Sequence, residues 1–293
     1  MRFRFRIPPD KGADAVSFIS GLGFSLSRHN AVNVLKREGN SVSIYDTGTV
    51  LCELKDDLYS RTVIHYFQNF RIDYNDYVRK VLGIEMKDSW AGTDEAGKGD
   101  YFGPLVVAGV CVENETAGKL FISGVTDSKK LSSLEIMRLS KFIESTVGRE
   151  KIEVISISPE RYNEMYDEAG NINDILMWAH SKVIRNLCVR NSCTAAVIDR
   201  FFASSRLNEM KSMLPGIELH AVTGGEREIS VASASIIASA EFMRRLKELE
   251  RKLGAEIPAG GGKKASAFAR SMISEKGIDF FRKFGKANFR LQA

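Results

Sequence analysis

The sequence predicts an α/β fold: a mixed sheet flanked by helices, preceded by a small α+β domain. Three observations support this prediction. Short apolar runs alternate with longer helix-like runs after Trp90, one of the short runs is apolar throughout, and the N-terminus alternates between arginine and apolar residues. Alternation of strands and helices is typical of a sheet whose faces are covered by helices.

The N-terminal segment has the pattern of a strand with one basic and one apolar face. Arg2, Arg4 and Arg6 alternate with apolar residues, and successive side chains of a strand point to opposite faces. Two helices and a hairpin are expected to follow, over Ala13–Leu22, Asp57–Phe70 and residues 42–54. We therefore expect a small α+β domain at residues 1–70, joined to the rest by a polar, partly helical linker at residues 71–88.

The larger domain is expected at residues 89–293. Its predicted strands are Leu105–Val112, Ile152–Ile157, Ala195–Ile198 and Gly216–Val222, and its predicted helices are Ser132–Val147, Asp174–Cys188 and Val231–Leu253. The run Ala195–Ile198 is apolar throughout and ends at Asp199, as expected for a strand covered on both faces. Active sites of such sheets collect at the carboxyl ends of strands, which makes Asp199 a candidate site residue.

The composition excludes several classes of protein. No apolar run approaches the roughly 18 residues of a membrane span, and the N-terminus lacks the apolar core of a secretory signal. We therefore expect a cytoplasmic protein without a membrane partner. The 4 cysteines form no C-x-x-C pair and are interpreted as small core residues rather than as zinc ligands or disulfides.

The charge of the chain is unevenly distributed. The formal net charge is +5, and residues 262–293 alone carry 8 lysines and arginines against 2 acids. A basic segment of this kind fits a polyanionic partner such as nucleic acid.

The stretch Gly92–Gly109, GTDEAGKGDYFGPLVVAG, joins two adjacent acids to a glycine-rich turn. Its glycine spacing misses the dinucleotide-binding fingerprint, and it lacks the Lys-Ser/Thr ending of a P-loop. A small-molecule nucleotide cofactor is therefore not expected.

A metal site explains the paired acids better. Asp94, Glu95 and a third carboxylate from another strand, Asp199, would give the hard oxygen ligands that suit Mg²⁺ or Mn²⁺. Neighbours in a regular strand point to opposite faces, so both acids reach one site only if the backbone bends. Gly97 and Gly99 provide the freedom for such a bend.

Five segments of the chain resemble those of type 2 ribonucleases H, in the same order. They are Asp94–Val110 (DEAGKGDYFGPLVVAGV), Val125–Leu131, Gly170–Asn173 with His180, Ala196–Phe201 and Ser230–Ala238. The aromatic continuation Asp100–Pro104 is similar to ribonuclease HIII in particular. The N-terminal portion resembles the small TATA-box-binding-protein-like domain of ribonuclease HIII.

The resemblance implies a divalent-metal-dependent endonuclease that cuts the RNA strand of RNA–DNA hybrids and leaves 5′-phosphate and 3′-hydroxyl ends. It implies a two-metal site with Asp94, Glu95 and Asp199 as ligands. The fourth acid of the family falls on Gly225 in direct register, so Glu226, Glu228 or no glutamate could fill that role, and we favour Glu226.

The resemblance also implies the residues that contact substrate. The turn Gly97-Lys98-Gly99 would approach the ribose–phosphate chain, and a contact to the 2′-hydroxyl distinguishes RNA from DNA. Lys129 would either contact phosphate or form a structural ion pair with Asp127, and the same two alternatives hold for Ser128. Independently of the resemblance, the basic face of the first strand predicts phosphate contacts by Arg2, Arg4 and Arg6. His180 is interpreted as a core histidine.

Two rival functions remain open at this point. The first is cleavage at single ribonucleotides embedded in duplex DNA, as in ribonuclease HII. The second is a non-catalytic protein that binds RNA–DNA hybrids, which gains weight if the fourth acid is absent. The sequence carries no oligomerisation signal, so we expect a monomer.

Overall fold

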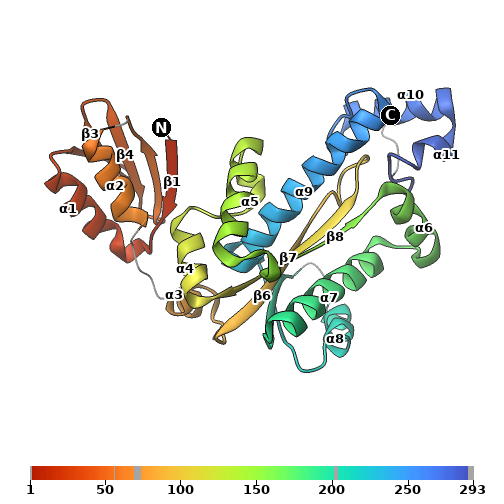
Figure 1. Ribbon diagram of the computed structural model, residues 1–293, viewed down its shortest axis with the longest axis horizontal. Coiled ribbons are helices and arrows are strands. Elements are labelled where there is room, and N and C mark those ends of the chain that lie inside the picture. Colours follow the sequence, from red (N-terminus) through yellow and green to blue (C-terminus); the bar gives the residue numbers. More distant parts are fainter. Residues whose placement is uncertain (1, 56, 69–73, 201–203, 290–293) are drawn as a thin grey trace. The chain divides into compact units, whose positions relative to one another are not determined.

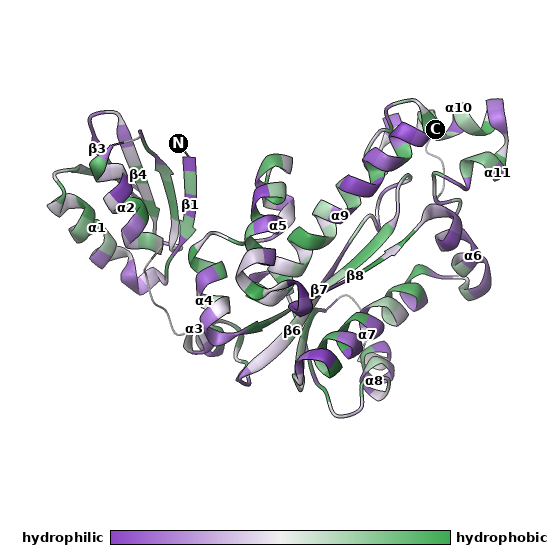
Figure 2. Cartoon of the chain, in the orientation of Figure 1, coloured by the Kyte–Doolittle hydropathy of each residue, from purple (hydrophilic) through white to green (hydrophobic). Residues whose placement is uncertain are grey.

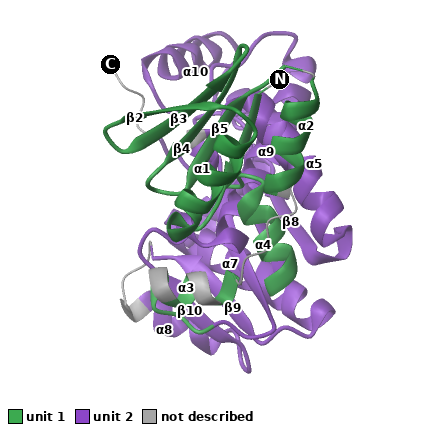
Figure 3. Cartoon of the chain, turned by 90° about the vertical axis from the view of Figure 1, so that its left-hand side faces the viewer, with its two compact units in different colours: residues 1–85, 113–125 green, residues 86–112, 126–293 purple. Residues whose placement is uncertain are grey.

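A computed structural model describes residues 2–55, 57–68, 74–200 and 204–289. These residues form two compact units (Figure 3): one comprises residues 1–85 and 113–125, the other residues 86–112 and 126–293. The domain bounds expected from the sequence stay a prediction. The end of the expected helix at 69–70, the start of the linker at 71–73, Phe201 and the last residues of the basic segment, 290–293, lie outside the described residues.

The N-terminal unit contains a five-stranded antiparallel sheet of order β1-β5-β4-β3-β2. Its strands are β1 (Arg2–Arg6), β2 (Ser25–His29), β3 (Val32–Arg37), β4 (Asn40–Tyr45) and β5 (Thr49–Glu53). Its helices are η1 (Pro9–Lys11), α1 (Gly12–Gly21), α2 (Leu58–Gln68), α3 (Tyr74–Leu82) and α4 (Asn114–Ile122). The expected N-terminal strand and hairpin are confirmed, because β1 pairs with β5 and β4 pairs with β5 across the turn.

The two faces of this sheet differ. One face packs Phe5, Val42, Val50 and Leu35 into a core with α1 and α2. The cross-strand register places Arg4, Leu51, Ser43, Val34 and Ser27 in one row on the opposite face. The contrast between an apolar face and an open face therefore extends from β1 through β5, β4 and β3. We call the face that carries Arg4, Leu51, Ser43, Val34 and Ser27 the open sheet face.

The second unit contains a five-stranded sheet of order β10-β9-β6-β7-β8. Its strands are β6 (Ser89–Ala96), β7 (Leu105–Glu113), β8 (Ile152–Ile157), β9 (Ala195–Asp199) and β10 (Glu218–Val222). Strands β6, β9 and β10 run parallel, whereas β7 and β8 pair antiparallel. The mixed sheet expected from the sequence is confirmed.

Helices cover both faces of this sheet (Figure 1). The helices of this unit are η2 (Ser128–Lys130), α5 (Ser133–Val147), η3 (Arg149–Lys151), α6 (Pro159–Ala169), α7 (Ile172–Asn191), α8 (Ser204–Ser212), η4 (Gly225–Arg227), α9 (Ile229–Leu253), α10 (Lys263–Lys276) and α11 (Ile278–Phe281). Gly92 in β6 allows the start of α9 to approach, because a Cβ there would meet the backbone of Ser230 and Val231. On the other face, a Cβ at Gly109 would meet Leu187 of α7 at 2.7 Å.

Helix α9 changes character along its length. Its first half is a run of small and aliphatic residues, buried from Ile229 to Ala238, and its second half is hydrophilic (Figure 2). Helices α10 and α11 form a separate apolar cluster with Tyr101 and Phe102. Among the described residues, no helix is both long enough and apolar enough to cross a membrane.

Candidate active site

Asp94 and Asp199 lie near the carboxyl ends of two neighbouring parallel strands. The pairing of β6 with β9 runs from Ala91↔Ala196 to Thr93↔Ile198, so the next residue on each strand is an aspartate. Residues in register on parallel strands point to the same face. The carboxylates that the sequence placed at strand ends therefore lie side by side in this register.

Asp94 and Glu95 point to opposite faces of the sheet. Thr93 and Glu95 face α7, where the His180 Nδ1 lies 2.8 Å from the Thr93 hydroxyl and its Nε2 lies 3.4 Å from Glu95 Oε2. Asp94 faces α9, where Ser235 donates a hydrogen bond to it. Strand β6 continues to Ala96, so the bend that would bring both acids to one site does not occur within the strand.

The environment of the Asp94 carboxylate disfavours its ionised form. Burial raises the pKa of Asp94 to about 7, the negative charge of Glu95 adds to the rise, and Ser235 and Lys129 oppose it. A divalent cation would remove this penalty, so the donor chemistry of Asp94 and Asp199 fits a hard metal ion.

Glu95 is stabilised in its ionised form. Burial acts to raise its pKa, but the hydrogen bond and charge of His180 and the charge of Lys98 outweigh burial and lower it. The Lys98 Nζ lies 3.5 Å from Glu95 Oε1. In the described residues, no three His, Cys, Asp or Glu side chains come close enough to hold a metal ion. The structure thus brings two acids together and leaves Glu95 on the other face.

Asp199 is in contact with the segment that carries the uncertain fourth acid. Its Oδ1 accepts the N–H of Gly225 at 3.0 Å and the N–H of Arg200 at 3.0 Å. A Cβ at position 225 would lie 2.8 Å from the Asp199 Cα, so an acidic side chain there would displace backbone. Glu226 follows in η4 and is half-buried.

Glu228 has a structural role at the start of α9. It is fully buried and is the N-cap of α9: its Oε2 accepts the N–H groups of Ser230 at 2.9 Å and Val231 at 3.2 Å. Its Oε1 accepts the indole N–H of Trp90 at 3.0 Å. Both oxygens are engaged in these contacts, which leaves Glu226 as the other glutamate of this segment.

Two of the predicted substrate residues, Ser128 and Lys129, lie in η2, which packs on α9 as Asp94 does. The Ser128 hydroxyl lies 2.8 Å from that of Ser235 and 2.9 Å from that of Ser239, and it is buried. Lys129 is exposed, and its positive charge acts on Asp94. Its backbone N–H donates to Asp127 Oδ1 at 3.1 Å.

The turn after β6 is shaped by glycine. Gly97 has a φ of +83°, and a Cβ there would lie 2.8 Å from the Phe242 ring. By contrast, a Cβ at Gly99 would meet nothing within 4 Å. One side of the turn is packed on α9, and the other is open.

Sequence reasoning missed the residues that orient these acids. His180 is fully buried, as expected of a core histidine, but it also contacts Glu95. The sequence did not indicate that Ser235 and Gly225 contact the two aspartates. The contacts of a serine side chain or of a glycine N–H can be assigned only when the neighbouring residues in space are known.

A mixed sheet covered by helices on both faces, with adjacent aspartates at the carboxyl ends of parallel strands, defines a nuclease of the ribonuclease H class. The family model of ribonuclease HII matches residues 91–292. Ribonuclease HIII of Chlamydia pneumoniae is 32% identical over 78% of this chain and 73% of its own length. Ribonuclease HIII of Aquifex aeolicus is 28% identical over 98% of both chains.

A solved structure supports the same fold. Bst-RNase HIII in complex with Mn²⁺ has a TM-score of 0.65 and 24% sequence identity, covering 99% of this chain and 96% of its own. The chain belongs to the ribonuclease HII family, and within that family to the ribonucleases HIII. It is a hydrolase, an endonuclease that degrades the RNA strand of RNA–DNA hybrids.

Proposed function

We propose that this endonuclease is metal-dependent, with Asp94, Asp199, Glu95 and Glu226 as the ligands of Mg²⁺ or Mn²⁺. The register that sets Asp94 beside Asp199 is the observation that carries this proposal. The relative Bst-RNase HIII was solved in complex with Mn²⁺. A pair of such ions supplies activation of a water and stabilisation of the leaving 3′ oxygen, which yields 5′-phosphate and 3′-hydroxyl ends.

Glu95 and Glu226 complete the proposed ligand set. Glu95 is ionised, which is the form that binds metal, and its charge acts on Asp94. To join Asp94, the Glu95 side chain has to turn away from the α7 face of β6, where it contacts His180. Glu226 is proposed because Gly225 contacts Asp199 and Glu228 is engaged as a helix cap.

The Gly97–Gly99 turn is proposed to contact the RNA strand and to recognise it as RNA. Its open side at Gly99 allows backbone amides to approach ribose closely, and contact with the 2′-hydroxyl distinguishes RNA from DNA. Lys98 is 38% exposed and can contact a phosphate. Exposed Lys129 is proposed as a second phosphate contact, whereas buried Ser128 positions η2 against α9.

The open sheet face of the N-terminal unit is the surface proposed to bind the RNA–DNA duplex. Arg2, Arg4 and Arg6 line its edge strand and pair in register with Glu53, Leu51 and Thr49. Arg2 forms an ion pair with Glu53 at 2.9 Å, and the Arg6 guanidinium lies 5.0 Å from the centre of the Phe121 ring. A basic edge beside a partly apolar face suits phosphates and the shallow, wide groove of an RNA-containing helix.

Comparison of Asp94→Asn and Asp199→Asn with Asp88→Asn tests the metal-site proposal. Asp88 is exposed directly before β6 and serves as the matched control. With Mg²⁺ or Mn²⁺, the first two variants should lose at least about a thousandfold in cleavage of an end-labelled hybrid. Their hybrid affinity, measured by fluorescence anisotropy without metal, should stay within about threefold of the unsubstituted protein.

Two outcomes would contradict the proposal. Cleavage by Asp94→Asn at the level of Asp88→Asn would remove the metal site from this position. Efficient incision at a single ribonucleotide embedded in duplex DNA would favour the activity of ribonuclease HII instead.

A further inference from the structure

The chain just after the Gly97–Gly99 turn is held by backbone from the C-terminal region. The N–H of Lys286 donates to the Tyr101 carbonyl at 2.8 Å, and the N–H of Gly103 donates to the Phe284 carbonyl at 3.0 Å. Phe102 and Gly285 form an isolated antiparallel bridge. A short ladder thus fixes residues 101–103.

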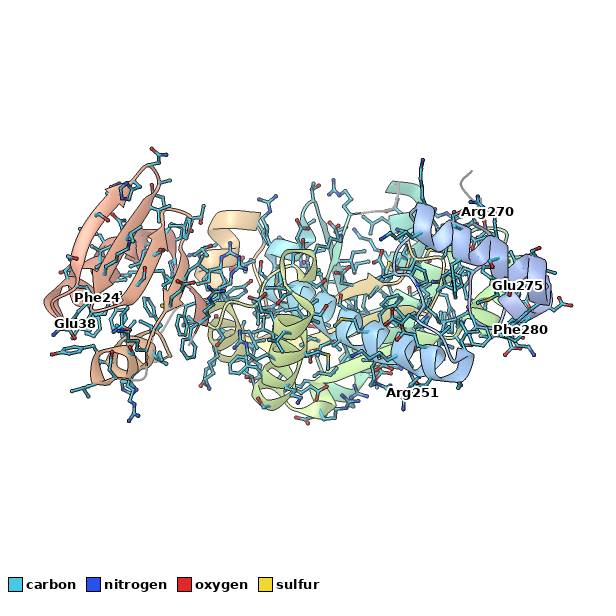
Figure 4. All side chains as sticks on the ribbon, turned by 90° about the horizontal axis from the view of Figure 1, so that it is seen from above. Phe24, Glu38, Arg251, Arg270, Glu275 and Phe280 are labelled. Carbon is cyan, nitrogen blue, oxygen red and sulfur yellow. The ribbon has the colours of Figure 1, made fainter. Side chains whose placement is uncertain are left out.

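A second C-terminal segment contacts the turn itself. Asp100 Oδ1 accepts the N–H of Gly260 at 2.6 Å, and the Gly260 carbonyl accepts the N–H of Tyr101 at 3.2 Å. A Cβ at Gly261 would lie 2.6 Å from the Gly99 carbonyl oxygen. We call residues 259–262 and 284–287 the C-terminal clamp; they flank α10 and α11, which carry Arg270, Glu275 and Phe280 (Figure 4).

Lys286 is the one side chain of the described clamp whose charge is fully buried. It is 1% exposed, and its Nζ donates to the Asp100 carbonyl at 2.9 Å. Burial lowers the pKa of Lys286 to about 7, opposed by the charge of Asp100. A buried ammonium is costly, and an apolar side chain of similar length would fill the same space without this cost.

The backbone around Lys286 is fixed independently, from α6. Asn163 Nδ2 donates to the Gly285 carbonyl at 2.8 Å, and its Oδ1 accepts the N–H of Ala287 at 2.8 Å. The Tyr162 ring lies 5.7 Å from the Lys286 Nζ. The Lys286 side chain therefore extends from a backbone segment held by Asn163 to the carbonyl of Asp100, directly after the turn.

We propose that Lys286 is a positioning residue for the Gly97–Gly99 turn: by holding the Asp100 carbonyl it keeps the amides of the turn in the orientation that meets the RNA strand. This inference rests on the proposed role of the turn. When the turn is already ordered, substrate binding does not have to supply the free energy of ordering it. Loss of this order should therefore weaken substrate binding and raise KM.

The variant Lys286→Met tests the inference, because it removes the donor and keeps the length of the side chain. Lys252→Met, on an exposed lysine near the end of α9, removes the same charge and serves as control. Lys286→Met should raise KM for a hybrid about tenfold, the effect of removing one charged hydrogen bond, with kcat within about twofold. Its melting temperature should change by no more than a few degrees, because loss of the buried charge offsets the loss of the donor to the Asp100 carbonyl.

Hydrogen exchange of the turn gives a readout that does not depend on activity. Amides of residues 96–104 should exchange faster in Lys286→Met, while amides of α7 should not change. Unchanged exchange would overturn the inference, and so would a melting temperature lowered by more than a few degrees with kcat and KM both impaired.

Lys98→Met separates this inference from the proposed function. The amides of the turn could exchange faster in Lys286→Met while neither Lys286→Met nor Lys98→Met changes KM. In that case the turn does not bind substrate, and its proposed role in recognising the RNA strand is wrong. If Lys98→Met raises KM and Lys286→Met does not, the positioning role alone is overturned.

Discussion

The open sheet face of the N-terminal unit and the strand-end site of the second unit present charge in opposite ways. Arg2 is 86% exposed in its side chain and pairs with an exposed glutamate. Asp94 and Glu95 are largely buried, and their pKa values move in opposite directions. Exposed cations keep their ordinary chemistry and give affinity that salt screens. Buried carboxylates are perturbed, as expected where a cation is to be bound.

The two regions should therefore contribute to different measured quantities. Substitutions on the open face should change binding and its salt dependence, whereas substitutions at the strand ends should change the rate. The predictions below test this separation, beginning with the largest effect.

Glu226→Gln and Glu228→Gln should separate catalysis from folding. Glu226→Gln should lower kcat by about a hundredfold or more with the melting temperature unchanged, since it removes a proposed ligand. Glu228→Gln should destabilise the protein by about 1–3 kcal/mol, because a buried acceptor of Trp90 and of the α9 amides becomes in part a donor. Thermal unfolding and single-turnover cleavage measure both.

If Glu226→Gln keeps full activity, Glu226 is not a ligand and its proposed role is wrong. If Glu228→Gln is stable but inactive, the cap assignment is wrong.

The triple variant Arg2→Gln, Arg4→Gln and Arg6→Gln should weaken hybrid binding by about ten- to a hundredfold at low salt. The slope of log Kd against log salt should fall by about one for each phosphate that is no longer neutralised by an arginine. The kcat at saturating hybrid should stay within about twofold. Binding titrations at several salt concentrations, together with turnover at saturating hybrid, give these quantities.

Arg28→Gln is the matched control for this triple variant. Arg28 lies on β2 with its partner Asp46 at 3.0 Å, and the register places it on the helix-covered side. An equal reduction of affinity in the control would show that general charge, rather than the open face, governs binding.

The pH dependence of stability should reveal Asp94. Its folded pKa of about 7 lies above the ordinary value of 3.8, so the folded metal-free protein keeps a proton that the unfolded chain has released between those values. Stability should therefore fall as pH rises through this window and stay low above pH 7. Asp94→Asn should melt a few degrees higher than the unsubstituted protein at pH 8 in EDTA, and the difference should shrink toward pH 5.

Added Mg²⁺ or Mn²⁺ should remove most of this difference by stabilising only the unsubstituted protein. A melting difference that is the same at pH 5 and pH 8 would show that the charge of Asp94 is not the cause.

The sequence predicted the strand-end acids because local pattern determines them. A continuous apolar run marks a strand buried on both faces, and the residue after it falls at the sheet edge, as Asp199 does. It favoured Glu226 but did not exclude Glu228, since a metal ligand and a helix N-cap are both acids placed before a helix. Only the contacts of Glu228 with Trp90 and the α9 amides make the distinction.

Other features left no local signal. Strand β2 is exposed along its length and carries no apolar alternation, so its polar residues did not indicate a strand. The contact of Lys286 with Asp100 joins residues 186 positions apart. The glycine-rich segment before α10 carried no signal of its contact with Asp100, because the partner of Gly260 lies in a distant turn.

The most direct test of the central claim is to locate Mn²⁺ by anomalous diffraction from crystals of this protein soaked in the ion. The account predicts an ion coordinated by carboxylate oxygens of both Asp94 and Asp199. An ion bound elsewhere, with these two aspartates free of metal, would contradict it.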